Sequence, residues 1–201
     1  VLHSFFVVNV LHSMAIPSIW IIHESYTSRE YLSMLPEYQH KNFHNAFHQA
    51  VNVVFGSSAL PTLYKECLDD VNFLVIHPAI PEKFSSEYGN TDLRRRCRKE
   101  YDIPESCILV LTVGAFEPYK NQKLLVEAAK LVHEDGICFF LVGGNPESVY
   151  QQSIAENIRT NNLDDKVMII PEVADVVPFY LAADIFAFTS IWDTYPLVVL
   201  E

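Results

Sequence analysis

The chain has 201 residues, half of them hydrophobic, and its 25 acidic and 14 basic side chains give a net charge of −11. This acidic balance argues against nucleic acid as a main partner, because neutralising phosphates needs clustered Lys and Arg. The length suffices for one substantial hydrophobic core or two small ones. The sequence begins with Val1 and stops inside a helical pattern, so we expect a fragment of a longer protein.

Short apolar runs rich in β-forming residues mark the first 80 residues. They predict strands over Phe5–Val10, Ser18–Ile22, Val51–Phe55 and Asn72–His77. Apolar residues within Glu37–Ala50 recur at helical spacing. Ser58 is suited to cap a further short helix that has Pro61 in its first turn.

The apolar start of the chain also raises the question of a membrane span. His3, Asn9 and Ser13 interrupt it and Pro17 splits it. Two short strands therefore fit better than one spanning helix, which needs ~20 apolar residues. None of the four cysteines belongs to a C-x-x-C pair, so neither a zinc ribbon nor a redox motif is indicated, and Cys107 and Cys138 are expected to be buried.

Residues 78–104 change in composition, with Pro, Ser, Glu, Asn and Arg in place of long apolar runs. We interpret them as a linker followed by a charged helix over Asp92–Tyr101. The basic run Arg94–Lys99 is either the solvated face of that helix or a contact with an anionic surface.

A regular alternation of strands and helices follows Pro104. The predicted strands are Ile108–Val113, Ile137–Val142, Val167–Ile170 and Ile185–Phe188. The predicted helices are one closed by Gly136, one opened by Asn145 and Pro146, and Asp175–Ala182.

Because the strands are continuous apolar runs, both of their faces should be buried, as in parallel sheets covered by helices. The predicted fold class is therefore α/β with two Rossmann-like domains, over residues 1–80 and 105–201, joined by residues 81–104.

Loops after parallel strands are where such folds bind ligands. Gly114 ends one strand and permits close backbone approach, and Lys120 sits where the next helix begins. A lysine beside a helix N-terminus suits a phosphate site, although an ordinary surface lysine is the alternative. The loop that begins at Gly143 is not a G-x-G-x-x-G fingerprint, so it is either a plain turn or a ligand-lining loop.

The last stretch of the chain combines a strand, a polar loop and a helix start at Pro196. Backbone N–H groups between Tyr195 and Leu197 should stabilise an anion there. The carboxylate of Glu201 suits a vicinal diol, which ribose and hexoses both offer. A solvent-facing role for Glu201 and a turn role for Asp193 are the alternatives.

Histidines offer two further candidates. His23 ends a strand and either points into a cleft to bind substrate or is a structural histidine. His40, His44 and His48 share one face of a helix, which suits either a metal site or a solvated stripe.

In chain order, the motifs G-x-x-x-P-x-K, L-V-G-G, Y-L-A-A-D-I-F-A-F-T-S and D-x-x-P-L-V-V-L-E resemble those of the retaining glycosyltransferases of family 4. The resemblance implies a GT-B fold, with two Rossmann-like domains and the second one binding the donor. It implies that Lys120 holds the diphosphate and that Glu201 binds the ribose. Asp193 takes the place of a glutamate that contacts the transferred sugar, and Ala115 replaces the usual arginine.

By the same resemblance, His23 binds and orients the donor sugar, and Lys120 and Asp193 complete the catalytic group. The remaining donor-binding residues are Gly114, Gly143, Glu172, Val173, Tyr195, Pro196, Leu197 and Glu201. Glu172 and Val173 are expected near the base, and neither a cofactor nor a metal is expected, because Lys120 can stabilise the leaving group.

The expected function is transfer of a hexose from a nucleoside diphosphate sugar to an alcohol acceptor with retention, in cell-envelope polysaccharide biosynthesis. The acceptor is a glycan, a lipid-linked molecule or a small molecule. The alternatives are a non-catalytic nucleotide-sugar-binding module, which Ala115 and Asp193 would mark, and a GT-B epimerase. The expected location is the cytoplasm, with peripheral contact at the inner face of the membrane left open.

Overall fold

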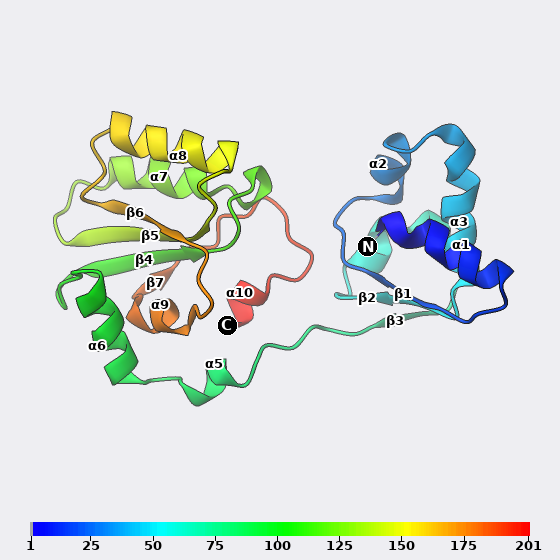
Figure 1. Cartoon of the computed structure of the whole chain (residues 1–201), viewed down its shortest axis with the longest axis horizontal. Helices are drawn as coiled ribbons and strands as arrows, with labels where there is room; N and C mark the ends of the chain where they lie inside the picture. Colours follow the sequence, from blue (N-terminus) through cyan, green and yellow to red (C-terminus); the bar gives the residue numbers. More distant parts are fainter. Residues whose placement is uncertain (1) are drawn as a thin grey trace. The chain divides into compact units, whose positions relative to one another are not determined.

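A computed structural model describes residues 2–201 and shows two compact units. The first comprises the chain through Ala79 together with Asp193–Pro196, and the second comprises Ile80–Trp192 with Leu197–Glu201. Each unit has its own parallel sheet, with strand order β1-β2-β3 in the first and β6-β5-β4-β7 in the second (Figure 1). The predicted fold class, parallel sheets covered by helices, is confirmed.

The first unit is built from short elements. Its strands are β1 (Ile19–Ile22), β2 (Asn52–Phe55) and β3 (Phe73–Val75). Its helices are α1 (Phe5–Ser13), α2 (Ser28–Ser33), α3 (His40–Gln49) and α4 (Leu60–Leu63), with 3-10 turns at Leu2–Ser4, Glu37–Gln39 and Lys65–Cys67. The buried rings of Trp20, Phe43 and Phe47 pack between the sheet and α3, and they anchor the core of this unit.

The second unit holds the longer strands. They are β4 (Ile108–Val113), β5 (Ile137–Gly144), β6 (Val167–Pro171) and β7 (Ile185–Phe186). Its helices are α5 (Lys83–Ser86), α6 (Thr91–Glu100), α7 (Gln122–Leu131), α8 (Val149–Thr160), α9 (Val177–Ala182) and α10 (Leu197–Leu200), with a 3-10 turn, η4, at Pro118–Lys120.

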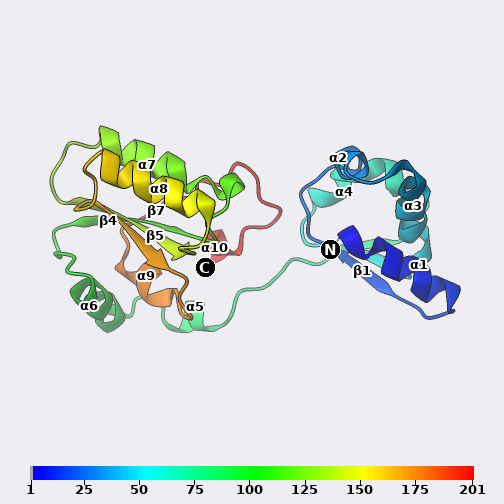
Figure 2. The same ribbon diagram turned by 45° about the horizontal axis from the view of Figure 1, so that its top comes forward.

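Helices cover both faces of the second sheet. Helices α7 and α8 lie together over one face, and α6 and α9 lie over the other (Figures 1 and 2). Side chains alternate accordingly, because Val110 packs in the core beneath α7 and α8 while Leu109 and Leu111 pack in the core beside α9. This two-sided burial explains why the strands read as continuous apolar runs rather than alternating ones.

The prediction of a strand over Phe5–Val10 is wrong, because these residues belong to helix α1. Phe5 and Val8 are buried, whereas Phe6 and Val7 are exposed, which is the spacing of a helix that buries one side. A six-residue apolar run does not by itself distinguish a strand from a buried helical segment.

Three predicted helix boundaries also differ. Helix α4 has Ala59 at its N-cap and no side-chain cap, so Ser58 does not cap it. Asn145 instead accepts a hydrogen bond from the amide of Glu147 and forms a turn, and Ser148 caps α8 by accepting from Gln151. Helix α7 ends at Leu131, where the next residue is already extended, and not at Gly136.

The basic run of α6 is solvated only in part, because Arg95, Arg96 and Lys99 are exposed whereas Arg94 and Arg98 bind groups of the protein. Arg98 is 1% exposed, and Arg94 and Arg98 bind the two carboxylate oxygens of Asp184 at 2.7 and 2.6 Å. Arg98 also donates to the carbonyls of Ala182 at 3.0 Å and Pro104 at 2.8 Å. Helix α6, which was predicted to follow a linker, is therefore packed into the second unit through Arg94 and Arg98.

The apolar start of the chain forms α1 and β1 with a break between them. Within residues 2–201 no helix combines the length and the apolar character that crossing a bilayer requires.

Candidate functional site

The carboxyl ends of β4, β5 and β6 meet along one edge of the second sheet. Val113 pairs with Val142, and Gly144 pairs with Pro171 after a bulge. The amide of Glu172 then donates to the carbonyl of Gly144 at 3.0 Å, which fixes the loop after β6 against the end of β5. Three loops are thereby held side by side at the edge where α/β sheets bind ligands.

A cavity of about 260 Å³ opens between these loops. It is lined by Val113, Gly114, Ala115, Val142, Gly143, Glu172, Val173 and Val176. The structure thus brings together four residues that the sequence analysis assigned to the donor, namely Gly114, Gly143, Glu172 and Val173. The sequence placed these residues in three separate loops, and the structure shows that the loops line one cavity.

Close backbone approach shapes this cavity at Gly143. Its φ of +108° is one that side-chain-bearing residues rarely adopt. A Cβ atom placed there would lie 2.6 Å from the carbonyl oxygen of Gly114, well inside van der Waals contact. The ends of β4 and β5 can therefore approach this closely only because position 143 is glycine.

Gly143→Ala is expected to destabilise the chain by about 3 kcal/mol, because backbone strain of roughly 1–2 kcal/mol adds to the clash with Gly114. The matched control is Gly136→Ala, since Gly136 has φ +76° and no atom within 4 Å of its Cβ position. Thermal unfolding of both variants measures the difference. Equal losses of stability in the two variants would contradict the close approach of Gly143 to the carbonyl of Gly114.

Gln122 is a site residue that the sequence analysis missed. It is 2% exposed, and its Nε2 donates to the carbonyl of Ala115 at 2.8 Å and to that of Gly114 at 3.4 Å. It occupies the first position of the buried stripe of α7, which continues with Leu125, Val126 and Ala129. A polar residue at an otherwise apolar helical position was the signal that could have identified it.

Lys120 ends the η4 turn two residues before α7 begins, as the spacing predicted. The turn is held by the loop after β7. Thr189 Oγ1 donates to the carbonyl of Lys120 at 2.8 Å, and the amide of Ile191 donates to that of Tyr119, also at 2.8 Å. The rings of Tyr119 and Trp192 stack with centroids 5.8 Å apart. The loop after β7 therefore holds the backbone that carries the lysine.

Glu201 belongs to the same unit. Its amide donates to the carbonyl of Leu197 in α10, and its carboxylate oxygen Oε2 accepts a hydrogen bond of 2.8 Å from the hydroxyl of Tyr180. Helix α10 spans Leu197–Leu200. The orientation of Glu201 thus rests on a side-chain contact.

The remaining predicted site residues belong to the first unit. His23 follows β1, and its Nδ1 lies 3.3 Å from the position that a Cβ on Gly56 would take. Asp193, Tyr195 and Pro196 cluster with the same unit, where the ring of Tyr195 stacks on that of His77 with centroids 5.1 Å apart.

Two histidines of α3 make contacts within the protein. His40 Nε2 lies 3.1 Å from the carbonyl of Leu35, and His44 Nδ1 lies 3.4 Å from the sulfur of Cys67. Across residues 2–201, no three His, Cys, Asp or Glu side chains come close enough to share one metal ion.

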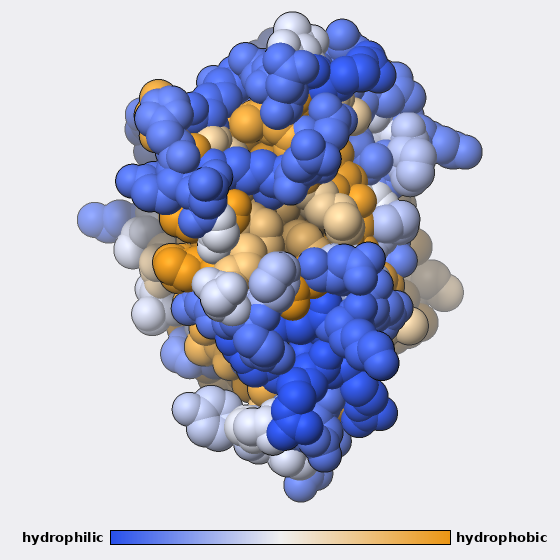
Figure 3. Space-filling model, turned by 90° about the vertical axis from the view of Figure 1, so that its left-hand side faces the viewer, coloured by the Kyte–Doolittle hydropathy of each residue, from blue (hydrophilic) through white to orange (hydrophobic). Residues whose placement is uncertain are grey.

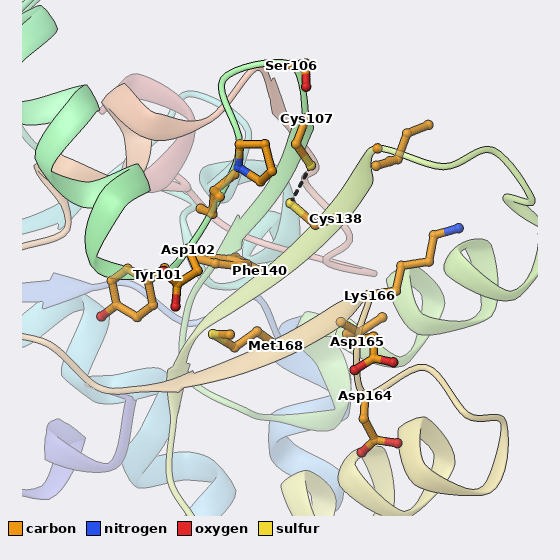
Figure 4. A pocket seen from close by; sticks show the side chains of 15 residues that line it. Tyr101, Asp102, Ser106, Cys107, Cys138, Phe140, Asp164, Asp165, Lys166 and Met168 are labelled. Atoms are coloured by element: carbon orange, nitrogen blue, oxygen red, sulfur yellow. Dashed lines mark hydrogen bonds between the residues drawn. The ribbon is translucent and has the colours of Figure 1, made fainter.

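A second cavity, of about 290 Å³, lies at the opposite, amino end of the strands. Figure 3 shows hydrophobic atoms in the middle of this side of the molecule, bordered by hydrophilic ones. In the close view the thiols of Cys107 and Cys138 point toward each other at 3.1 Å (Figure 4). Burial and the neighbouring Cys107 thiol raise the pKa of Cys138, so this thiol is a poor nucleophile at neutral pH. This second cavity therefore lies at the edge of the sheet opposite the loops that follow β4, β5 and β6.

Comparison with known proteins finds similarities in both sequence and fold. The family described as glycosyl transferases group 1 matches residues 94–201, more than half of the chain. A UDP-Gal:alpha-D-GlcNAc-diphosphoundecaprenol alpha-1,3-galactosyltransferase of Escherichia coli is 27% identical over 124 residues, which cover 60% of this chain and 31% of that protein.

Two solved structures share the fold. HepE of Anabaena in complex with UDP superposes with a TM-score of 0.82 at 17% identity, covering 100% of this chain and 54% of that one. WaaG, a glycosyltransferase involved in lipopolysaccharide biosynthesis, gives a TM-score of 0.70 at 16% identity, covering 96% and 59%. The chain therefore spans little more than half the length of these neighbours.

Proposed function

The chain belongs to the glycosyl transferases group 1, and from this premise we propose that it transfers a hexose from a nucleoside diphosphate sugar to an alcohol acceptor with retention of configuration. The observation that carries the proposal is the cavity lined by Gly114, Gly143, Glu172 and Val173. The loop that starts at Gly114 ends in the Lys120 turn, so one segment supplies both close backbone approach and a cation.

The donor we propose is a UDP-hexose. The Escherichia coli relative is named for UDP-Gal, and HepE was solved with UDP. The acceptor we propose is a carbohydrate or lipid-linked alcohol of the cell envelope, since the relative's name specifies a diphosphoundecaprenol acceptor. A cytoplasmic location with peripheral membrane contact fits such an acceptor.

The reaction breaks the bond between the anomeric carbon and the phosphate oxygen, and the acceptor oxygen forms the new bond. Lys120 stabilises the charge that develops on the departing diphosphate, which is the largest electrostatic demand of the step. The departing phosphate takes the acceptor proton. Glu201 accepts hydrogen bonds from the ribose hydroxyls, and Glu172 and Val173 lie beside the base.

The remaining predicted residues have the roles that the family resemblance implies. Asp193 contacts the transferred sugar, with Tyr195, Pro196 and Leu197 around the sugar phosphate, and His23 orients the donor sugar. No metal is needed in this scheme, because Lys120 supplies the cation.

A donor and acceptor panel followed by proton NMR tests the proposal. We expect a new glycosidic bond, in the anomeric configuration of the donor, only when an acceptor is present, and at the same rate with a chelator. Conversion of the donor without acceptor would identify an epimerase. Binding of UDP-sugars with no product from any acceptor would identify a binding module, for which Ala115 and Asp193 are the motivating departures.

A further inference from the structure

The contact between Tyr180 and Glu201 joins two residues that are 21 positions apart. Tyr180 lies in α9, and its hydroxyl is 2.8 Å from Glu201 Oε2 and 3.3 Å from the carbonyl oxygen of Val198. A phenol has one hydrogen to donate, and the shorter contact to a charged acceptor is the stronger of the two. The hydroxyl therefore bonds primarily to the carboxylate.

The ring of Tyr180 is held in place by other aromatic side chains. It packs against Phe186 of β7 with ring centroids 5.5 Å apart, and against Phe84 of α5 at 6.0 Å. A ring fixed in this way presents its hydroxyl from a constant position. The hydrogen bond to Glu201 therefore comes from the rigid body of the second unit rather than from a mobile surface group.

The hydroxyl remains a donor at neutral pH. Burial raises the pKa of Tyr180, and the hydrogen bond to Glu201 and the charge of that carboxylate raise it further. A carboxylate accepts hydrogen bonds on both of its oxygens, and the bond from Tyr180 to Oε2 fixes the rotation of the Glu201 carboxylate about its last side-chain bond.

We propose that Tyr180 is a positioning residue that orients the Glu201 carboxylate, and that it thereby sets how strongly this chain prefers nucleotides with ribose 2′- and 3′-hydroxyls. The inference rests on the proposed function, because it assigns the ribose to Glu201. It adds a residue that does not touch the donor and acts only through the carboxylate.

The test compares UDP with its 2′,3′-dideoxy analogue by calorimetric titration of the full chain. The wild-type chain should bind UDP at least a hundredfold more tightly than the analogue. Tyr180→Phe, which keeps the ring and its packing, should lower that preference about tenfold by weakening UDP binding alone. Tyr101→Phe is the matched control, because Tyr101 packs against Phe140 and Phe179 of the same unit and lines the cavity at the other edge.

Each outcome decides the matter. Loss of affinity for both nucleotides in equal measure, or an unchanged preference in Tyr180→Phe, would overturn the positioning role while leaving the proposed function intact. A wild-type chain that does not distinguish the nucleotides would overturn the ribose role of Glu201 and this inference with it. In a Glu201→Ala background, Tyr180→Phe should have no further effect on the preference.

Discussion

Lys120→Ala is expected to lower turnover by about two to three orders of magnitude, because it removes the cation from the leaving group where negative charge develops. The fold should stay intact, since the contacts that hold the η4 turn come from Thr189 to a backbone carbonyl and from Ile191 to the carbonyl of Tyr119. Alanine retains both of these backbone acceptors. Steady-state rates with saturating donor, together with thermal unfolding, measure the two expectations.

The matched control for this variant is Lys123→Ala. Lys123 is exposed on α7, three residues after Lys120, and its replacement by alanine also removes one positive charge. It should leave turnover within about twofold of the wild type, because exposed side chains away from the site have small effects. If Lys120→Ala turned over as fast as Lys123→Ala, the diphosphate assignment would be wrong. Lys120→Arg should recover part of the rate, since it restores the charge with a different geometry.

Arg98→Leu is expected to destabilise the second unit by about 3 kcal/mol, which lowers its melting temperature by roughly 10 °C. The loss comes from the bonds of Arg98 to the carbonyls of Ala182, Pro104 and Cys107; Ala182 keeps Arg94 as a donor and Pro104 keeps the amide of Cys107. Asp184 keeps two other partners, the guanidinium of Arg94 at 2.7 Å and the amide of Leu109 at 2.8 Å, so its charge is not left isolated. The effect should therefore stay below that of breaking a lone buried ion pair.

Arg95→Leu on the same helix provides the control. Arg95 is two-thirds exposed and pairs with Asp92 at 3.0 Å, a type of surface ion pair that contributes less than about 1 kcal/mol. Denaturant unfolding of the two variants should separate them clearly. A similar small loss in both would show that the contacts of Arg98 add little.

The same cluster predicts how stability depends on pH. Burial raises the pKa of Asp184, but the amide of Leu109 and the guanidinium groups of Arg94 and Arg98 outweigh it, so the folded-state pKa lies below its usual range. The resulting stabilisation is complete above the unfolded pKa of about 3.9 and is lost as the pH falls through the folded-state pKa. Asp184→Asn should accordingly be less stable at pH 7 and show a flatter loss of stability in acid.

The sequence was most informative where burial on both sides dictates residue type. The strand over Ile108–Val113 was predicted with its observed bounds, because a parallel strand between two helical layers has apolar side chains on both faces. Gly114 was predicted to end β4 and to permit close backbone approach, whereas the sequence left the loop at Gly143 open between a plain turn and a ligand-lining loop. Phe5–Val10 failed because a short apolar run fits a half-buried helix equally well.

What the sequence did not predict depends on contacts between distant positions. Arg98 and Asp184 are 86 residues apart, and nothing local to either residue indicates the other. Tyr180 is part of the family motif, but the motif assigned it no role. Its bond to Glu201 follows from how α9 and α10 pack. Gln122 stands out as a polar residue in an apolar helical stripe, but its partners, the backbone carbonyls of Gly114 and Ala115, carry no sequence signal.

Hydrogen exchange of the full chain, with and without a UDP-hexose, tests the central claim that the edge near Gly114 holds the donor. We expect slower amide exchange in residues 113–122, 142–145 and 171–176 when the donor is bound, and unchanged exchange around Cys107 and Cys138. Protection confined to the amino-end cavity, or no protection at any of the three loops, would contradict the account.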